Sequence, residues 1–157
     1  MMGNGTVLHG LPISVDYWRL PKSHEKYKVT NLMLSMFTCF INKNIFEWSC
    51  VHQKYLYFLT HLHTDHTQGL TSTWTETIYT SALNAELVVA MLKVKPSLVV
   101  TLEIGTTIMI DLPARYGEEE SQFVSVTAID ANHIRGSVMF LFEGRNIRDL
   151  SHALDGK

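Results

Sequence analysis

Three histidines and one aspartate fall within six consecutive residues, as His61, His63, Asp65 and His66. Neutral imidazole and carboxylate groups are ligands that zinc and other borderline divalent metals accept in proteins. The alternative is a group of ordinary polar residues, but four such side chains would each need a separate hydrogen-bond partner if they were buried. The spacing therefore predicts a metal-binding loop for one or two ions.

The segment before this cluster predicts how the four side chains are presented. Residues 55–60 are apolar and rich in β-forming types, which indicates a buried strand that ends at His61. Successive side chains of a strand alternate between its faces, so His61 and His63 should point to the same side. Asp65 and His66 then lie on the following turn, where they can converge on a second point nearby.

The other apolar segments predict an α/β chain. Ser81 is the expected N-cap of a helix over residues 82–93, and Pro96 should stop it. The apolar residues at helical spacing, which we expect in the core, are Leu83, Leu87, Ala90 and Met91. Strands are expected at residues 8–18, 78–80, 99–103, 107–110, 123–130 and 138–142, with 99–103 and 107–110 paired as a hairpin.

A fourth histidine, His133, lies at a polar corner between two expected strands. It follows the strand over 123–130 and precedes the apolar strand over 138–142. Loops at strand ends often carry functional residues. An isolated histidine in such a loop is more often an ordinary surface residue, so its position alone leaves both interpretations open.

The composition excludes several classes of protein. The 157 residues, of which 46% are hydrophobic and 18% charged, suit one folded domain rather than a disordered chain. The formal net charge of −2 provides no basic field of the kind that nucleic-acid-binding domains often carry. The two cysteines, Cys39 and Cys50, exclude a disulfide-rich scaffold and fit a reducing compartment. The N-terminal residues predict no signal peptide.

Residues 29–53 interrupt the pattern of strands. Their apolar part, residues 32–41, is shorter than the about 20 residues that a membrane-spanning helix needs, so no membrane partner is expected. Two explanations stay open for these 25 residues (53 − 29 + 1). They are either translated from an in-frame retained intron or a genuine loop, whose apolar patch would need cover.

Several segments, taken together, resemble the DNA crosslink-repair nucleases of the metallo-β-lactamase fold, and among them the 5′ exonucleases. Besides the histidine cluster these are ISVDYW at 13–18, GLTSTW at 69–74, LEIG at 102–105 and DANHIRGSVMFLFEG at 130–144. The resemblance covers most of residues 11–27 and 55–144. It implies the N-terminal half of an αββα sandwich with a mixed sheet. Residues 1–28 and 55–144 would form this partial domain, with 29–53 as an insertion and 145–157 as a divergent tail.

The resemblance also assigns the site. It implies that His61, His63 and His133 hold one zinc ion, while Asp65 and His66 reach a second ion and take part in catalysis. Asp16 would support the metal loop by orienting a ligating histidine. Without the resemblance, Asp16 is equally well explained as a residue that begins a turn.

The function implied is hydrolysis of phosphodiesters from a DNA 5′ end, in single-stranded or end-processed duplex DNA. Proteins of this family act in interstrand crosslink repair and telomere maintenance, which implies the nucleus and makes telomere-associated proteins candidate partners. Bound ions would activate water and neutralise charge on the phosphate. The GLTSTW and FLFEG segments argue against another hydrolase of the fold, such as a β-lactamase or thioesterase.

The chain also departs from the family pattern. Ile134 and Arg135 follow Asn132-His133 where the family has Cys and Pro, which removes a fixed φ and adds a charge. The family continues with a T-G-D-F-R motif whose Asp bridges two ions. Neither Asp149 nor Asp155 follows an apolar strand, so we assign that role to neither. The alternative to an exonuclease is therefore a catalytically incomplete fragment, acting as a binding module or present as a non-functional isoform.

Overall fold

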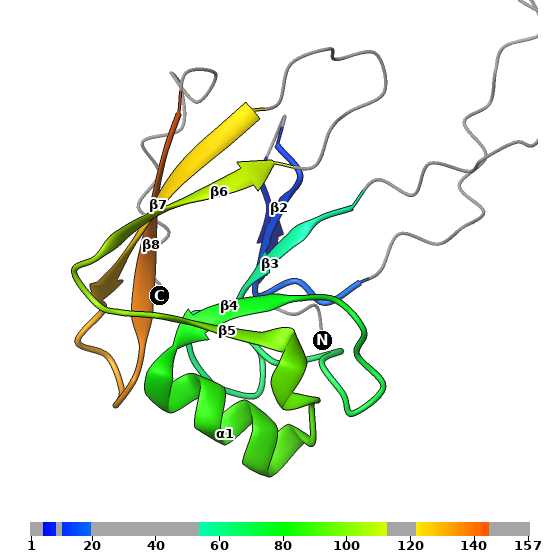
Figure 1. Cartoon of the computed structure of the whole chain (residues 1–157). Helices are drawn as coiled ribbons and strands as arrows, with labels where there is room; N and C mark the ends of the chain where they lie inside the picture. Colours follow the sequence, from blue (N-terminus) through cyan, green and yellow to red (C-terminus); the bar gives the residue numbers. More distant parts are fainter. Residues whose placement is uncertain (1–4, 9–10, 20–53, 113–121, 145–157) are drawn as a thin grey trace, which may run out of the picture. The chain divides into compact units, whose positions relative to one another are not determined.

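Two β-sheets lie face to face, and one helix covers the other face of the larger sheet (Figure 1). The structure is a computed structural model that describes residues 5–8, 11–19, 54–112 and 122–144. The insertion predicted at 29–53 and the tail predicted at 145–157 lie outside these residues. The predicted α/β class with a mixed sheet is confirmed. Among the described residues, no helix has the length and apolar character needed to cross a membrane.

The larger sheet has five strands in the order β1-β2-β3-β4-β5. They are β1 (Thr6–Val7), β2 (Ile13–Val15), β3 (Leu56–Phe58), β4 (Ile78–Ser81) and β5 (Val99–Leu102). β1 is antiparallel to β2, and the other neighbours are parallel. The opening strand predicted over 8–18 is present but shorter, because only Ile13–Val15 form it. Its antiparallel partner β1 lies before the predicted segment.

The smaller sheet is antiparallel, in the order β6-β7-β8. Its strands are β6 (Thr107–Leu112), β7 (Gln122–Asp130) and β8 (Val138–Glu143). The prediction of a hairpin between 99–103 and 107–110 is wrong, because β5 pairs with β4 whereas β6 pairs with β7. Gly105, at φ 83°, lies where the chain passes from one sheet to the other, and an isolated bridge joins Ile104 to Ala128 of β7.

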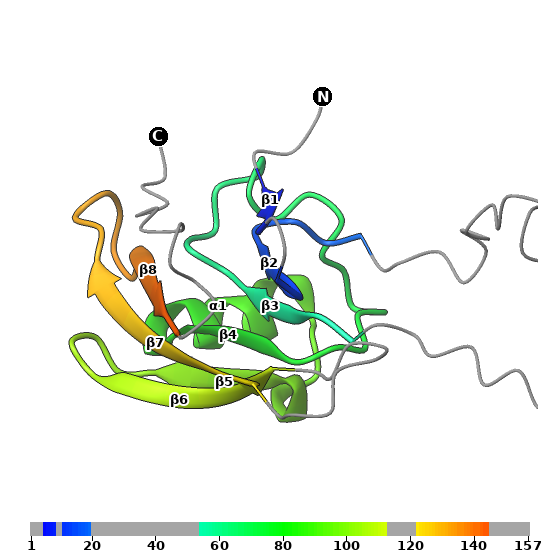
Figure 2. The ribbon, with the colours of Figure 1, turned by 90° about the horizontal axis from the view of Figure 1, so that it is seen from above.

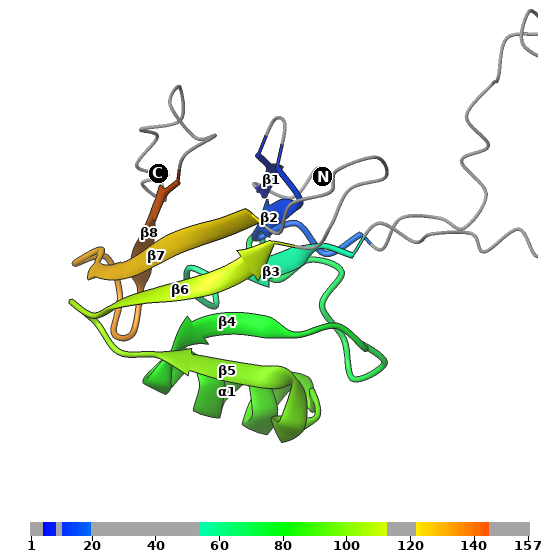
Figure 3. The ribbon, with the colours of Figure 1, turned by 45° about the horizontal axis from the view of Figure 1, so that its top comes forward.

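β3 and the residue after it are buried on both faces of the sheet. Leu56 and Phe58 belong to the apolar cluster between the two sheets, whereas Tyr57 and Leu59 belong to the cluster that includes the helix. This division follows from the alternation of side chains along a strand. Figures 2 and 3 show β4, the neighbour of β3, between the helix on one side and β6 and β7 on the other. The strand that leads to His61 is therefore fixed by packing on both sides.

The helix α1 (Ala82–Leu92) connects β4 to β5, followed by a short 3-10 turn, η1 (Pro96–Leu98). The predicted N-cap is confirmed, since the Ser81 side chain accepts a hydrogen bond from the backbone N–H of Asn84. The helix ends at Lys93, whose φ of 59° is left-handed.

The predicted core face of α1 is wrong. Met91 is 66% exposed and Leu83 37% exposed, whereas Asn84 and Val88 are buried. Apolar residues lie around most of this helix, so their spacing did not select a face. A hydrogen bond from the buried Asn84 amide to the Thr60 carbonyl, 2.9 Å long, lies on the buried face instead.

Candidate metal centre

The metal loop begins at His61, three residues after the end of β3, and contains a tight turn. The backbone N–H groups of His66 and Thr67 both donate to the carbonyl of His63, at 3.0 and 3.2 Å. The indole Nε1 of Trp18 donates to the His66 carbonyl at 2.7 Å, which ties the loop to the aromatic cluster under the sheet. His61 and His66 are buried, whereas His63 and Asp65 are exposed.

Three histidine rings meet at one point above the end of β3. Nε2 of His61 lies 3.0 Å from Nδ1 of His63, and Nε2 of His133 lies 3.3 Å from the same Nδ1. One ligand nitrogen from each of the three rings lies within 4.8 Å of the others. Zinc–nitrogen bonds of 2.0–2.1 Å at tetrahedral angles place two nitrogens about 3.3 Å apart, so the separations of His63 from His61 and from His133 fit a shared zinc ion.

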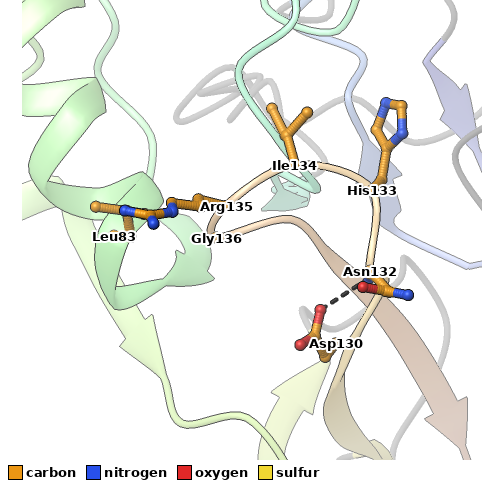
Figure 4. A pocket seen from close by; sticks show the side chains of 7 residues that line it. All are labelled: Leu83, Asp130, Asn132, His133, Ile134, Arg135 and Gly136. Atoms are coloured by element: carbon orange, nitrogen blue, oxygen red, sulfur yellow. Dashed lines mark hydrogen bonds between the residues drawn. The ribbon is translucent and has the colours of Figure 1, made fainter.

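His133 reaches this point from a corner 70 residues away along the chain from His63. The Ser137 hydroxyl accepts hydrogen bonds from the backbone N–H groups of His133 and Ile134, at 3.2 and 3.1 Å. Figure 4 shows the His133 ring projecting from this loop, away from Asp130. The replacement of the family's Cys and Pro by Ile134 and Arg135 therefore leaves His133 beside the metal loop.

Asp16 connects a second group of buried side chains. Its Oδ2 lies 2.7 Å from Nδ1 of His66 and accepts the Thr60 hydroxyl at 2.5 Å, while its Oδ1 accepts the Thr60 N–H at 2.8 Å. Asp16, His61 and His66 together could also hold a metal ion by distance alone. Both carboxylate oxygens of Asp16 are already engaged with protein donors, which favours an orienting role over ligation.

The neighbour of His66 on its other side is Asp65. With Nδ1 of His66 turned to Asp16, its Nε2 lies 3.8 Å from Oδ2 of Asp65. The two side chains are therefore neighbours, and the His66 ring also lies beside the His61 ring, with the ring centroids 4.0 Å apart. No distance contradicts a second ion there, and the role of Asp65 and His66 stays a prediction.

The two buried histidines have pKa values shifted in opposite directions. Burial, with a smaller contribution from the nearby His66, lowers the pKa of His61 to about 4. The hydrogen bond to Asp16 raises the pKa of His66 above its usual value. His61 is therefore neutral at physiological pH, which leaves a ring nitrogen with a lone pair for a metal ion.

Comparisons with known proteins identify relatives of this chain. No protein-family model matches the chain. The chain is 38% identical to 5′ exonuclease Apollo of Gallus gallus over 141 residues, which cover 90% of this chain and 22% of that protein. It is 39% identical to 5′ exonuclease Apollo of Danio rerio over 142 residues, 90% of this chain and 19% of that protein. The chain is related to the DNA cross-link repair nucleases of the Apollo type.

A more distant match supports the same relationship. Protein artemis of Mus musculus is 35% identical over 101 residues, which cover 57% of this chain and 14% of that protein. The resemblance to DNA crosslink-repair nucleases is thus confirmed. This chain spans about a fifth of the length of the two Apollo proteins.

Sequence reasoning did not assign a role to three residues that hold the metal loop in place. Thr60 bonds to Asp16 and contacts His61, Trp18 bonds to the His66 carbonyl, and Asn84 bonds to the Thr60 carbonyl. Thr60 carried a usable signal, since it is a polar residue at the end of an apolar strand, directly before the first histidine. The polar Asn84 within an apolar helix was a weaker signal.

Proposed function

We propose that this chain carries the metal centre of a 5′-3′ DNA exonuclease of the Apollo type, built on the N-terminal half of a metallo-β-lactamase αββα sandwich. The observation that supports this proposal best is the convergence of His61, His63 and His133. These residues come from two loops of the two facing sheets, and the nitrogens of His61 and His133 lie 3.0 and 3.3 Å from Nδ1 of His63, close to the separation in a tetrahedral zinc site. The related proteins named as exonucleases supply the reaction class.

The residues divide into two groups of ligands. In this proposal, Nε2 of His61, Nδ1 of His63 and Nε2 of His133 hold one zinc ion, and Asp65 with His66 reaches a second. A bound ion would supply Lewis acidity toward a phosphodiester and toward an attacking water molecule. The chain's own contribution is to hold the ligand rings: His66 is turned by Asp16, and the loop is tied to Trp18.

The substrate in this proposal is DNA with a 5′ end, either single-stranded or end-processed duplex. The activity would serve interstrand crosslink repair and telomere maintenance in the nucleus, with telomere-associated proteins as candidate partners. The formal net charge of −2 gives no bulk attraction to DNA, so local charge at the site, including bound ions, would have to hold the phosphate.

Metal binding tests the site directly. Purified 157-residue protein, stripped with a chelator and reloaded with zinc, should retain one or two ions per chain by elemental analysis. His61→Ala and His133→Ala should each lower the zinc affinity at least about 10-fold. Loss of a residue that only orients a ligand already has an effect of about this size, and these substitutions remove the ligand itself. Ile134→Ala is the matched control, because Ile134 is in the same corner and offers no ligand atom. Zinc binding that is unchanged by both histidine substitutions would overturn the site.

A nuclease assay then tests the reaction. Zinc-loaded protein is incubated with single-stranded DNA that carries a 5′ phosphate and a label at the 3′ end. Shortening of the labelled strand one nucleotide at a time, lost in Asp65→Asn, is the expected result. A protein that binds zinc through His61 and His133 but cleaves no DNA would overturn the exonuclease proposal and favour the metal-binding module instead.

A further inference from the structure

Thr60 is the point at which the parts of the metal centre are joined. This residue lies between β3 and His61 and is 4% exposed. Its N–H donates to Oδ1 of Asp16 at 2.8 Å, and its carbonyl accepts from the Asn84 amide and from the backbone N–H of Val138, at 2.9 and 3.0 Å. Its hydroxyl oxygen lies 2.5 Å from Oδ2 of Asp16 and 2.9 Å from Nδ1 of His61. All the polar groups of Thr60 are thus engaged.

The direction of these hydrogen bonds follows from the number of protons. A carboxylate only accepts, so the single hydroxyl proton of Thr60 must go to Asp16. The hydroxyl oxygen can then only accept at its other contact, which requires a proton on Nδ1 of His61. A neutral imidazole with its proton on Nδ1 has its lone pair on Nε2. Nε2 is the atom that lies 3.0 Å from Nδ1 of His63.

The same carboxylate orients His66 without an intermediate. Oδ2 of Asp16 accepts from Nδ1 of His66 at 2.7 Å, so this ring also presents Nε2 away from Asp16. One aspartate therefore fixes two rings, His66 directly and His61 through the Thr60 hydroxyl.

We propose that Thr60 is a positioning residue of the metal centre: its hydroxyl holds His61 in the tautomer that offers Nε2 to zinc. Its carbonyl also bonds to Val138, the first residue of β8, and so ties the metal loop to the strand that follows the His133 corner. The inference rests on the proposed function insofar as His61, His63 and His133 are taken to hold the ion.

A buried threonine can also make such bonds for stability alone, and Thr80 provides the matched comparison. Thr80 is 0% exposed, and its hydroxyl donates to the Leu59 carbonyl at 2.8 Å. It makes no hydrogen bond to a histidine of the site in the described part of the chain. Thr60→Val and Thr80→Val each remove one buried hydroxyl with little change of shape, but only the first removes a contact to His61.

The first measurement is zinc affinity, by competition with a chelator in the full 157-residue chain. Thr60→Val should bind zinc about 10- to 100-fold more weakly than the wild type, as is usual when a partner that orients a ligand is lost. Thr60→Ser keeps the hydroxyl and should restore binding to within a few-fold, as should Thr80→Val. Equal zinc affinity in Thr60→Val and the wild type would overturn the inference.

The second measurement needs no metal, and its deciding result comes from the wild-type protein. Nitrogen-15 NMR of the metal-free wild-type protein should find the His61 proton on Nδ1, and Thr60→Val should move a large share of it to Nε2. A wild-type His61 with its proton on Nε2 overturns the role of Thr60 even if the valine variant does not fold. If the wild type binds no zinc while the tautomer is as stated, the proposed metal centre fails and the effect of Thr60 on His61 stands.

Discussion

Replacing Asp16 by asparagine tests whether one carboxylate organises the centre. Asparagine has the same shape, and it tolerates the left-handed backbone of this position, where φ is 52°. It exchanges one oxygen acceptor for an NH2 donor. In the wild type, the Thr60 hydroxyl and Nδ1 of His66 both donate to Oδ2 of Asp16. If the amide nitrogen of the asparagine takes the place of Oδ2, it faces these same two donors.

The size of the effect follows from these two contacts. Hydrogen bonds to a charged acceptor contribute about 1.5–3 kcal/mol each, so losing two costs about 3–6 kcal/mol. The Thr60 hydroxyl can rotate and the His66 ring can carry its proton on Nε2 instead, so both can accept from the new amide, which recovers about 1 kcal/mol each. The expected loss is therefore about 1–4 kcal/mol in the free energy of unfolding of the metal-free protein.

The same rearrangement should weaken zinc binding. A His66 ring that accepts at Nδ1 carries its proton on Nε2, and a Thr60 hydroxyl that accepts from the amide no longer has to accept from His61. Neither His66 nor His61 is then held with the Nε2 lone pair free for a metal ion. We expect the zinc affinity to fall about 10- to 100-fold.

Chemical unfolding of the metal-free protein and chelator competition for zinc measure the two effects. Asp111→Asn is the control, because Asp111 is exposed on β6, and it should change stability by less than about 0.5 kcal/mol. The reasoning is refuted if Asp16→Asn unfolds at the same denaturant concentration as the control and binds zinc as tightly as the wild type.

Three further results are expected. Gly136→Ala should destabilise the fold more than Gly105→Ala does. Both glycines have φ 83°, but a Cβ at position 136 would lie 3.0 Å from Cβ of Leu83, whereas a Cβ at position 105 would meet no atom within 4 Å. Equal stability of the two variants in chemical unfolding would contradict this explanation. NMR titration of the metal-free protein should find a pKa of about 4 for His61 and a pKa above 6.5 for His66. His61 should therefore lower the stability of the fold as the pH falls from 6.5 to 4. The stability contributed by His66 should be present below pH 6.5 and lost as the pH rises through the pKa of His66 in the folded protein. Zinc at 100 times its dissociation constant should stabilise the wild type by about 2.7 kcal/mol, an effect that a chelator should abolish.

The sequence predicted those parts of the fold that depend on local pattern. The apolar run before His61 forms β3, and Ser81 caps a helix that ends at Lys93. The hairpin predicted for 99–110 failed because two short apolar runs separated by a glycine do not specify whether they pair with each other or with strands elsewhere.

The site was predictable to a similar extent. The spacing of His61, His63, Asp65 and His66 marks the loop without any structure. The approach of His133 required a resemblance, because 70 residues separate it from His63. The role of Thr60 was not predictable, since it depends on a carboxylate 44 residues away in the chain.

These long separations bear on the order of events when the chain folds. The contacts of Asp16 with His66 and of His63 with His133 close chain segments of 50 and 70 residues. Closing such segments is slow and becomes favourable only once the sheets have formed, so the ligands should not be assembled in the folding transition state. An ion that binds only the finished arrangement changes the rate of unfolding and not the rate of folding. Zinc should therefore lengthen the lifetime of the native chain without shortening the time needed to reach it.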